Sequence, residues 1–149
     1  MTATIINGKE IAAQMREELR MQVEAMDTQP GLAVILVGDD PASHVYVNNK
    51  IKACEKAGIK SFERKMSAQA SREEIAAVIA ELNADDAVHG ILLQLPLPGH
   101  LADAQEDLVQ MISPAKDVDG LTTTNAGKLF LGLKDGLVPC TPQGSLRLI

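Results

Sequence analysis

Leu32-Ala33-Val34-Ile35-Leu36-Val37 is the longest apolar run in this chain of 149 residues. A short and continuous apolar run predicts a β-strand that is buried on both faces, as in a parallel sheet. The turn-forming pair Pro30-Gly31 precedes the run, and Gly38-Asp39-Asp40-Pro41 ends it. We therefore expect an interior strand with other elements packed on both of its faces.

Further strands and amphipathic helices surround this run. Val88 to Leu93 is a second buried strand that ends at Gln94, and Ile59 to Met66 is a weaker strand candidate. Ser71 and Glu74 form a capping box, in which each side chain binds the other residue's free backbone N–H at a helix start. The helices expected from apolar spacing cover residues 9–26, 43–57, 71–82 and 101–112.

This alternation of strands and helices predicts an α/β domain with a mostly parallel sheet flanked by helices, which is a three-layer αβα arrangement. Ligands of such sheets bind at the carboxyl ends of the strands. These ends are expected at Gly38-Asp39-Asp40 and Gln94-Leu95-Pro96. Fold class alone does not assign a function, so the side chains at these ends must be read one by one.

The C-terminus predicts one more helix. Thr141 and Pro142 fit a helix N-cap and a first-turn proline. The sequence stops on Leu148-Ile149 without a C-cap or a polar tail. We therefore expect the helix from residue 142 to be cut short and the chain to be the front part of a longer protein.

The composition indicates one domain with an aliphatic core. Hydrophobic residues make up 46% of the chain and aromatic residues only 2%, with Tyr46 as the lone tyrosine. The 14 basic and 20 acidic side chains give a net charge of −6, which argues against nucleic acid as a partner. No apolar run reaches the length of a membrane span, and no signal peptide is evident. Cys54 and Cys140 form neither a metal-type pair nor a disulfide framework, so we expect a cytoplasmic protein with no metal and no membrane partner.

Tyr46 and Lys50 lie four residues apart on an expected helix and so share one of its faces. The tyrosine ring can stack on a flat ligand, and the lysine amine can move a proton if its neutral form is stabilised. The same spacing also fits an ordinary surface contact, which leaves both interpretations open.

Gln94, Asp117 and Asp119 are the other polar side chains with a candidate role. Gln94 ends an otherwise apolar strand, where its amide needs either a ligand or solvent. In an extended loop, Asp117 and Asp119 would point the same way, so both carboxylates could face one cleft. The alternative is a tight turn ending at Gly120, in which an aspartate binds its own backbone.

Several common site types are missing from the sequence. Neither Gly-x-Gly-x-x-Gly nor Gly-x-x-x-x-Gly-Lys-Ser/Thr occurs, so no phosphate-binding loop of these kinds is present. The three histidines have no metal-ligand spacing. Cys140 has no candidate base beside it in sequence, which favours a structural cysteine over a nucleophile.

Four motifs occur in an order that resembles one known family. They are Pro41-Ala42-Ser43-His44-Val45-Tyr46-Val47-Asn48-Asn49-Lys50, Gly90-Ile91-Leu92-Leu93-Gln94-Leu95-Pro96-Leu97-Pro98, Lys116-Asp117-Val118-Asp119-Gly120 and Pro139-Cys140-Thr141-Pro142-Gln143-Gly144. Together they resemble the N-terminal catalytic domain of bifunctional methylenetetrahydrofolate dehydrogenase/methenyltetrahydrofolate cyclohydrolases. The resemblance runs from about Ile5 to Ile149.

The resemblance implies that residues 1–149 are this N-terminal catalytic domain and that a Rossmann domain for NADP is absent from the chain. The intact enzyme would oxidise 5,10-methylenetetrahydrofolate with NADP and hydrolyse the 5,10-methenyl product to 10-formyltetrahydrofolate, which serves purine biosynthesis. Its partners would be tetrahydrofolate derivatives and a second copy in a homodimer. This chain alone would hold no cofactor, because the cofactor-binding residues are expected beyond Ile149.

The resemblance also assigns roles to individual residues. Tyr46 would stack on the folate, and Lys50 would transfer the proton in the cyclohydrolase step. Gln94 would hydrogen-bond Lys50, and Asp119 would hold the pterin ring; these four form the expected catalytic set. The expected substrate-binding set is Ser43, Tyr46, Val47, Lys50, Leu93, Gln94, Leu95 and Asp119.

Two departures and two alternatives accompany this interpretation. Family members often carry Phe-His-Pro after the Asp-Gly pair, where this chain has Leu121-Thr122-Thr123-Thr124, and the family's NADP-binding segments are missing. Short-chain dehydrogenases also use Tyr-x-x-x-Lys, but Gly38-Asp39-Asp40-Pro41 is not their glycine-rich loop. A domain that binds folate or a protein without turnover is the other alternative.

Overall fold

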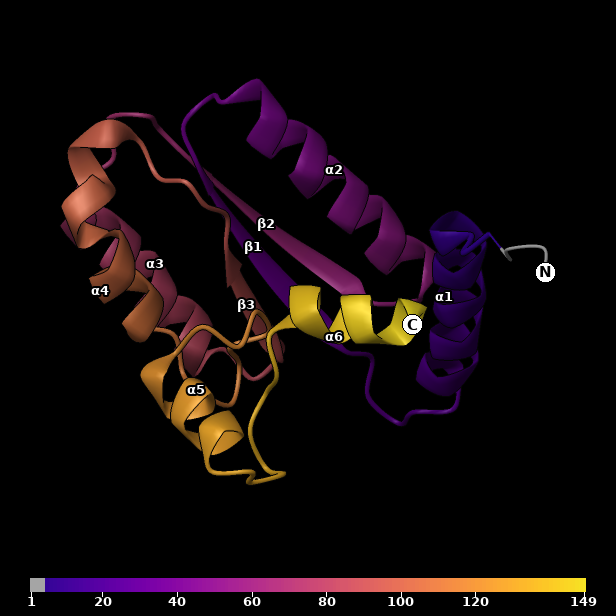
Figure 1. Cartoon of the computed structure of the whole chain (residues 1–149). Helices are drawn as coiled ribbons and strands as arrows, with labels where there is room; N and C mark the ends of the chain where they lie inside the picture. Colours follow the sequence, from indigo (N-terminus) through magenta and orange to yellow (C-terminus); the bar gives the residue numbers. More distant parts are fainter. Residues whose placement is uncertain (1–4) are drawn as a thin grey trace.

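The computed structural model describes residues 5–149 of the chain (Figure 1). Its centre is a sheet in the order β2-β1-β3, in which both neighbouring pairs are parallel. The strands are β1 (Gly31–Val37), β2 (Lys60–Met66) and β3 (Gly90–Leu93). In this register Val34 lies opposite Glu63 on one side and Leu92 on the other. The expected parallel sheet is confirmed, with the apolar run of β1 as its central strand.

Helices cover both faces of the sheet, as Figure 1 shows. One apolar cluster joins alternate residues of β1 and β3 to α3 (Arg72–Ala84) and α4 (Gln105–Gln110). A second cluster joins the other alternate residues, including Val34 and Leu92, to Val47 and Ile51 of α2 (Pro41–Lys56). Because β1 is apolar at every position, it can bury side chains on both faces at once. The three-layer arrangement is confirmed.

Local sequence determines several helix starts. Ser71 and Glu74 form the predicted capping box at the start of α3. At the start of α2, Asp40 accepts a hydrogen bond from the backbone N–H of Ser43 at 2.7 Å, and Pro41 occupies the first turn. This cap fixes the direction in which α2 leaves the carboxyl end of β1.

Other boundaries differ from the sequence-based expectation. The segment expected as one helix over 101–112 is a 3-10 helix, η1 (Gly99–Ala104), followed by the short α4. The C-terminal helix α6 (Cys140–Leu148) begins two residues before Pro142, with Pro139 and not Thr141 at its cap. The helix α5 (Thr123–Phe130) was not expected from sequence, because its threonines, asparagine and glycine are weak helix formers.

The first helix, α1 (Gly8–Glu24), forms where its apolar spacing predicts it. Nevertheless it buries none of its side chains, and Met15 and Leu19 of its apolar face stay exposed. The helix lies beside the C-terminal end of α6, where Leu148 approaches Gly8 (Figure 1). The expected amphipathic helix is therefore present without the burial that such a pattern usually indicates.

Candidate functional site

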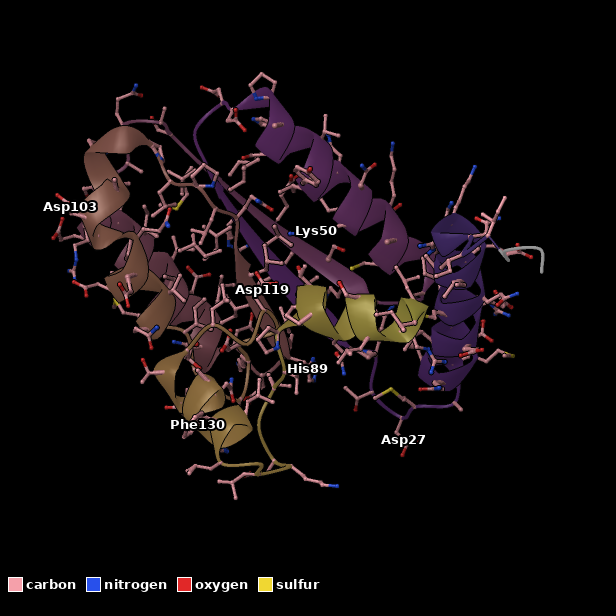
Figure 2. The ribbon with its side chains drawn as sticks, in the orientation of Figure 1. Asp27, Lys50, His89, Asp103, Asp119 and Phe130 are labelled. Atoms are coloured by element: carbon pink, nitrogen blue, oxygen red, sulfur yellow. The ribbon has the colours of Figure 1, made fainter. Side chains whose placement is uncertain are left out.

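A pocket with a volume of about 1040 Å³ lies between α2, the sheet and the first turn of α6. Its walls come mainly from five parts of the chain: α2, the strands β1 and β3, the loop after Lys116, and the segment that starts at Pro139. Figure 2 shows Lys50 on α2 and Asp119 in that loop on the same side of the molecule, near α6. The residues of this wall with a predicted role are Tyr46, Lys50, Leu93, Gln94, Leu95 and Asp119.

Lys50 and Gln94 meet at the wall of this pocket. The Lys50 Nζ donates a hydrogen bond to Gln94 Oε1 at 2.9 Å. The Gln94 Nε2 donates in turn to the backbone carbonyl of Leu95 at 2.7 Å, which fixes the amide with its oxygen toward the lysine. Within residues 5–149, no carboxylate forms an ion pair with Lys50. The contact that the resemblance implies between these two residues is confirmed.

Tyr46 lies one helical turn before Lys50 on the same face of α2, as predicted. Its side chain is 62% exposed, although the residue lines the pocket. A tyrosine ring in this position offers one face to a flat ligand that enters from solvent. The pair therefore combines a stacking surface with an amine about one turn further into the pocket.

Ser43 and Val47 do not lie on the pocket wall, unlike the other predicted substrate-binding residues. Val47 is 0% exposed and packs between α2 and the sheet, against Val34 and Leu92. Ser43 is 4% exposed, in the first turn of α2. Both side chains are buried, whereas Tyr46 and Lys50 line the pocket. The described pocket wall includes neither residue, and their role in substrate binding stays a prediction.

Asp117 and Asp119 point in different directions, because the loop forms the tight turn ending at Gly120 that was the alternative to an extended loop. Gly120 N donates to the Asp117 carbonyl at 3.0 Å, and Gly120 has a φ of 65°. This tight turn ends the extended geometry after Asp117, so the rule that residues two apart share a side no longer applies. Asp117 is 1% exposed and turned inward, and Asp119 lines the pocket.

The buried Asp117 carboxylate is surrounded by neutral donors. It accepts hydrogen bonds from Leu121 N, from Thr122 N and Oγ1, and from Asn125 Nδ2, over 2.8 to 3.1 Å. Burial by itself raises the pKa of Asp117, but the bonds from Asn125, Thr122 and Leu121 outweigh it and lower the pKa below its usual value. Asp117 therefore holds the loop together as an anion.

Cys140 lies next to Asp119, which sequence reasoning did not predict. Its Sγ donates a hydrogen bond to Asp119 Oδ1 at 3.3 Å. Desolvation of the thiol and the adjacent carboxylate raise the pKa of Cys140, so the thiol keeps its proton near neutral pH. A protonated thiol is a poor nucleophile, which agrees with the structural role expected for this cysteine.

The described residues provide no metal centre and no membrane segment. Between residues 5 and 149, no cluster of three or more His, Cys, Asp and Glu side chains is arranged to hold a metal ion. No helix in this range has both the length and the apolar character needed to cross a membrane. Of the described residues on the pocket wall, Lys50 and His89 are the only basic ones.

Most of the chain is similar to one family of known proteins. A family model described as the catalytic domain of tetrahydrofolate dehydrogenase/cyclohydrolase matches residues 6–119. The Bifunctional protein FolD of Maridesulfovibrio salexigens is 54% identical over 149 residues, which cover 97% of this chain and 51% of that protein. The protein of the same name from Magnetococcus marinus is 50% identical, over 99% of this chain and 52% of its own length.

Solved structures give the same result. The FolD methylenetetrahydrofolate dehydrogenase/cyclohydrolase of Campylobacter jejuni has a TM-score of 0.92 and 44% identity, over 97% of this chain and 52% of its own. The Trypanosoma brucei dehydrogenase-cyclohydrolase, solved with NADP cofactor and inhibitor, has a TM-score of 0.92 and 31% identity, over 99% and 52% of the two chains. The chain spans about half the length of the curated relatives it matches.

Proposed function

Because this chain belongs to the tetrahydrofolate dehydrogenase/cyclohydrolase family, we propose that it provides the folate site of a one-carbon enzyme. The complete activity oxidises 5,10-methylenetetrahydrofolate with NADP to the 5,10-methenyl form and hydrolyses that product to 10-formyltetrahydrofolate. The observation that carries this proposal is the 2.9 Å contact between Lys50 and Gln94 on a pocket wall shared with Tyr46 and Asp119. These four side chains come from three separate segments and converge on one pocket.

In the hydrolytic step, Lys50 is the proton-transferring residue. Water attacks the methenyl carbon, and the Lys50 amine takes one proton from the attacking water. When the bond between this carbon and N5 of the folate breaks, the Lys50 ammonium returns the proton to N5. The hydroxyl that remains on carbon loses its proton to solvent and becomes the formyl group, so one proton is released in total.

Gln94 orients the Lys50 amine for this transfer. Its amide oxygen accepts one N–H of the lysine, and its own N–H₂ is held by the Leu95 carbonyl, so the acceptor cannot easily rotate away. A neutral partner fixes the direction of the amine without the strong attraction that a carboxylate would exert on the ammonium form.

Tyr46 and Asp119 bind the two ends of the folate head. The exposed Tyr46 ring stacks on the aminobenzoate ring, and the Asp119 carboxylate accepts hydrogen bonds from ring N–H and amino groups of the pterin. The Cys140 thiol occupies one oxygen of Asp119 and leaves the other free for the ligand.

The residues of this chain do not fit NADP. The sequence contains no glycine-rich phosphate-binding loop, and the described pocket wall has no arginine for the cofactor phosphates. We therefore assign NADP to a second domain of the intact enzyme and derive no hydride step from these residues. A cytoplasmic location and a homodimer complete the proposal.

The substitution Lys50→Met in the full-length protein tests the proposed role. Hydrolysis of 5,10-methenyltetrahydrofolate, followed by absorbance, should fall by at least about a hundredfold, the lower range for loss of a general acid–base group. Lys52→Met is the matched control, since Lys52 lies on the same helix but is exposed and away from the pocket wall. Full turnover by Lys50→Met would refute the role of Lys50. If the wild-type protein binds folate but does not turn it over, the alternative of a non-catalytic binding domain is favoured.

A further inference from the structure

A buried polar cluster lies behind the Asp119 wall of the pocket, formed by Asp117, Thr122 and Asn125. All three residues are at most 2% exposed. Each polar atom of the Asn125 side chain has a partner: Nδ2 donates to Asp117 Oδ2 at 2.9 Å and to the Pro114 carbonyl at 2.8 Å, and Oδ1 accepts from Leu137 N at 3.1 Å. No group of the cluster lines the pocket.

These bonds connect two segments that form separate walls of the site. Asp117 precedes Asp119 by two residues, and Leu137 precedes Cys140 by three. The Asn125 amide is thus attached to both segments at once, through the Asp117 carboxylate and the Leu137 backbone. The two walls meet again at the pocket, where the Cys140 thiol donates to Asp119.

Gly120 allows the two segments to approach so closely. A Cβ at this position would lie 2.6 Å from Pro139 N, closer than real side chains come to backbone. The backbone φ of 65° also lies in the left-handed region that favours glycine. The contact between the walls therefore depends on two buried residues: Gly120, which lets the backbones approach, and Asn125, which bonds to both segments.

We propose that Asn125 is a positioning residue for the folate site, which sets the separation of the Asp119 wall from the Pro139–Cys140 wall. It touches neither ligand nor reacting atoms and acts through Asp117 and Leu137. This inference rests on the proposed folate function. It states in addition that pterin recognition by Asp119 depends on a side chain that faces away from the pocket.

The first test is Asn125→Ala in the full-length protein, with 5-formyltetrahydrofolate as a stable reduced-folate probe. The dissociation constant should rise about tenfold, because Asp119 is no longer held against its partner wall. In the hydrolysis assay KM should rise while kcat changes less than about twofold, since the cluster makes no described hydrogen bond to Lys50 or Gln94.

Asn83→Ala is the matched control. The Asn83 amide also bridges two backbone groups, donating to the Met111 carbonyl and accepting from Ser113 N, but it is not on the pocket wall. This variant should lose thermal stability and keep the wild-type affinity for the folate probe. Equal affinity losses in both variants would indicate general destabilisation and overturn the proposal.

A double-mutant cycle with Asp119→Ala provides the readout that a merely structural role would not affect. If Asn125 acts by placing Asp119, Asn125→Ala should raise the dissociation constant of the folate probe by less than about twofold in the Asp119→Ala background. An undiminished tenfold effect in the Asp119→Ala background would overturn the proposal. A wild-type protein that fails to bind the folate probe would refute the proposed function instead, so the two failures are distinguishable.

Asn125→Asp keeps the test decisive if the alanine variant fails to fold. This side chain retains the acceptor for Leu137 but puts a second carboxyl group 2.9 Å from Asp117 Oδ2. Two carboxyl groups this close favour a shared proton, which restores the hydrogen bond that the Asn125 amide donates to Asp117 in the wild type. The affinity of Asn125→Asp for the folate probe, relative to wild type, should therefore recover as the pH falls from about 8 to about 6. The two lysines closest in sequence are bound elsewhere, since Lys116 binds carbonyls at the end of α3 and Lys128 binds Asp135. Wild-type affinity for Asn125→Asp at the higher pH would overturn the proposal.

Discussion

Asp117 and Asp119 lie two residues apart, and their substitution by alanine is expected to have opposite consequences. Asp117→Ala should destabilise the fold and Asp119→Ala should leave it intact. The reason is their different surroundings: Asp117 is 1% exposed with four hydrogen bonds, and Asp119 is partly exposed with one weak bond from a thiol.

The magnitude for Asp117→Ala follows from the donors that lose their acceptor. The hydroxyl of Thr122 can rotate and Leu121 is exposed, so two buried N–H groups lose their acceptor: the backbone N–H of Thr122 and one N–H of the Asn125 amide, whose other N–H still binds the Pro114 carbonyl. At about 2 kcal/mol for each unsatisfied N–H, the free energy of unfolding falls by about 4 kcal/mol. Removal of the buried charge offsets about 1 kcal/mol of this loss. The net loss is about 3 kcal/mol, which for a chain of this length lowers Tm by roughly 6 to 12 °C.

Urea unfolding followed by far-UV circular dichroism is the suitable assay, because the chain has no tryptophan to report by fluorescence. Asp119→Ala serves as the control for the substitution itself and should lose less than about 0.5 kcal/mol. The same Asp119→Ala protein should bind the reduced folate at least about tenfold more weakly. The reasoning is refuted if Asp117→Ala loses less than about 1 kcal/mol, or if Asp119→Ala loses as much stability as Asp117→Ala.

Three further outcomes are expected. Because the folded-state pKa of Asp117 is lowered, its contribution to the free energy of unfolding is complete above about pH 4 and disappears as the pH falls through the folded pKa. The difference in stability between wild type and Asp117→Ala should therefore become smaller in urea titrations at acid pH, and a constant difference would contradict this. Gly120→Ala should lower Tm more than Gly144→Ala, because only the first places a Cβ against Pro139 N at positive φ; equal melting curves would count against the close approach. Gln94→Leu should lower the kcat of methenyltetrahydrofolate hydrolysis about tenfold, and an unchanged kcat would exclude orientation of the lysine by this amide.

The strands and the capped helices could be predicted from sequence because their determinants are local. The run from Leu32 to Val37 has no polar face, so only a strand covered on both sides satisfies it. The capping box of Ser71 and Glu74 lies within one helical turn and needs no distant partner. The same is true of Tyr46 and Lys50, whose shared face follows from helical spacing alone.

The helix α5 shows where local reasoning stops. Its sequence favours helix only weakly, and its position depends on Asn125, which binds Pro114, Asp117 and Leu137 from three points along the chain. Such contacts have no spacing that a sequence pattern could reveal. The segment over 101–112 is a second departure, since it forms a 3-10 helix and a short α-helix in place of the single helix that its apolar spacing predicts.

Sequence by itself determined the fold class, the helical pair Tyr46 and Lys50, and the family to which the chain belongs. Residue spacing could not predict that Gln94, 44 residues away from Lys50 along the chain, would contact the lysine; the family resemblance implied this contact, and the tertiary structure shows the amide oxygen 2.9 Å from the amine. It also decided that Asp119 faces the pocket and Asp117 the interior, because a single turn at Gly120 breaks the alternation expected of an extended loop. The physical reason is range: hydrophobic period and helix capping act within a few residues, whereas a site is formed by side chains that only the packing of the sheet and its helices brings into hydrogen-bonding distance.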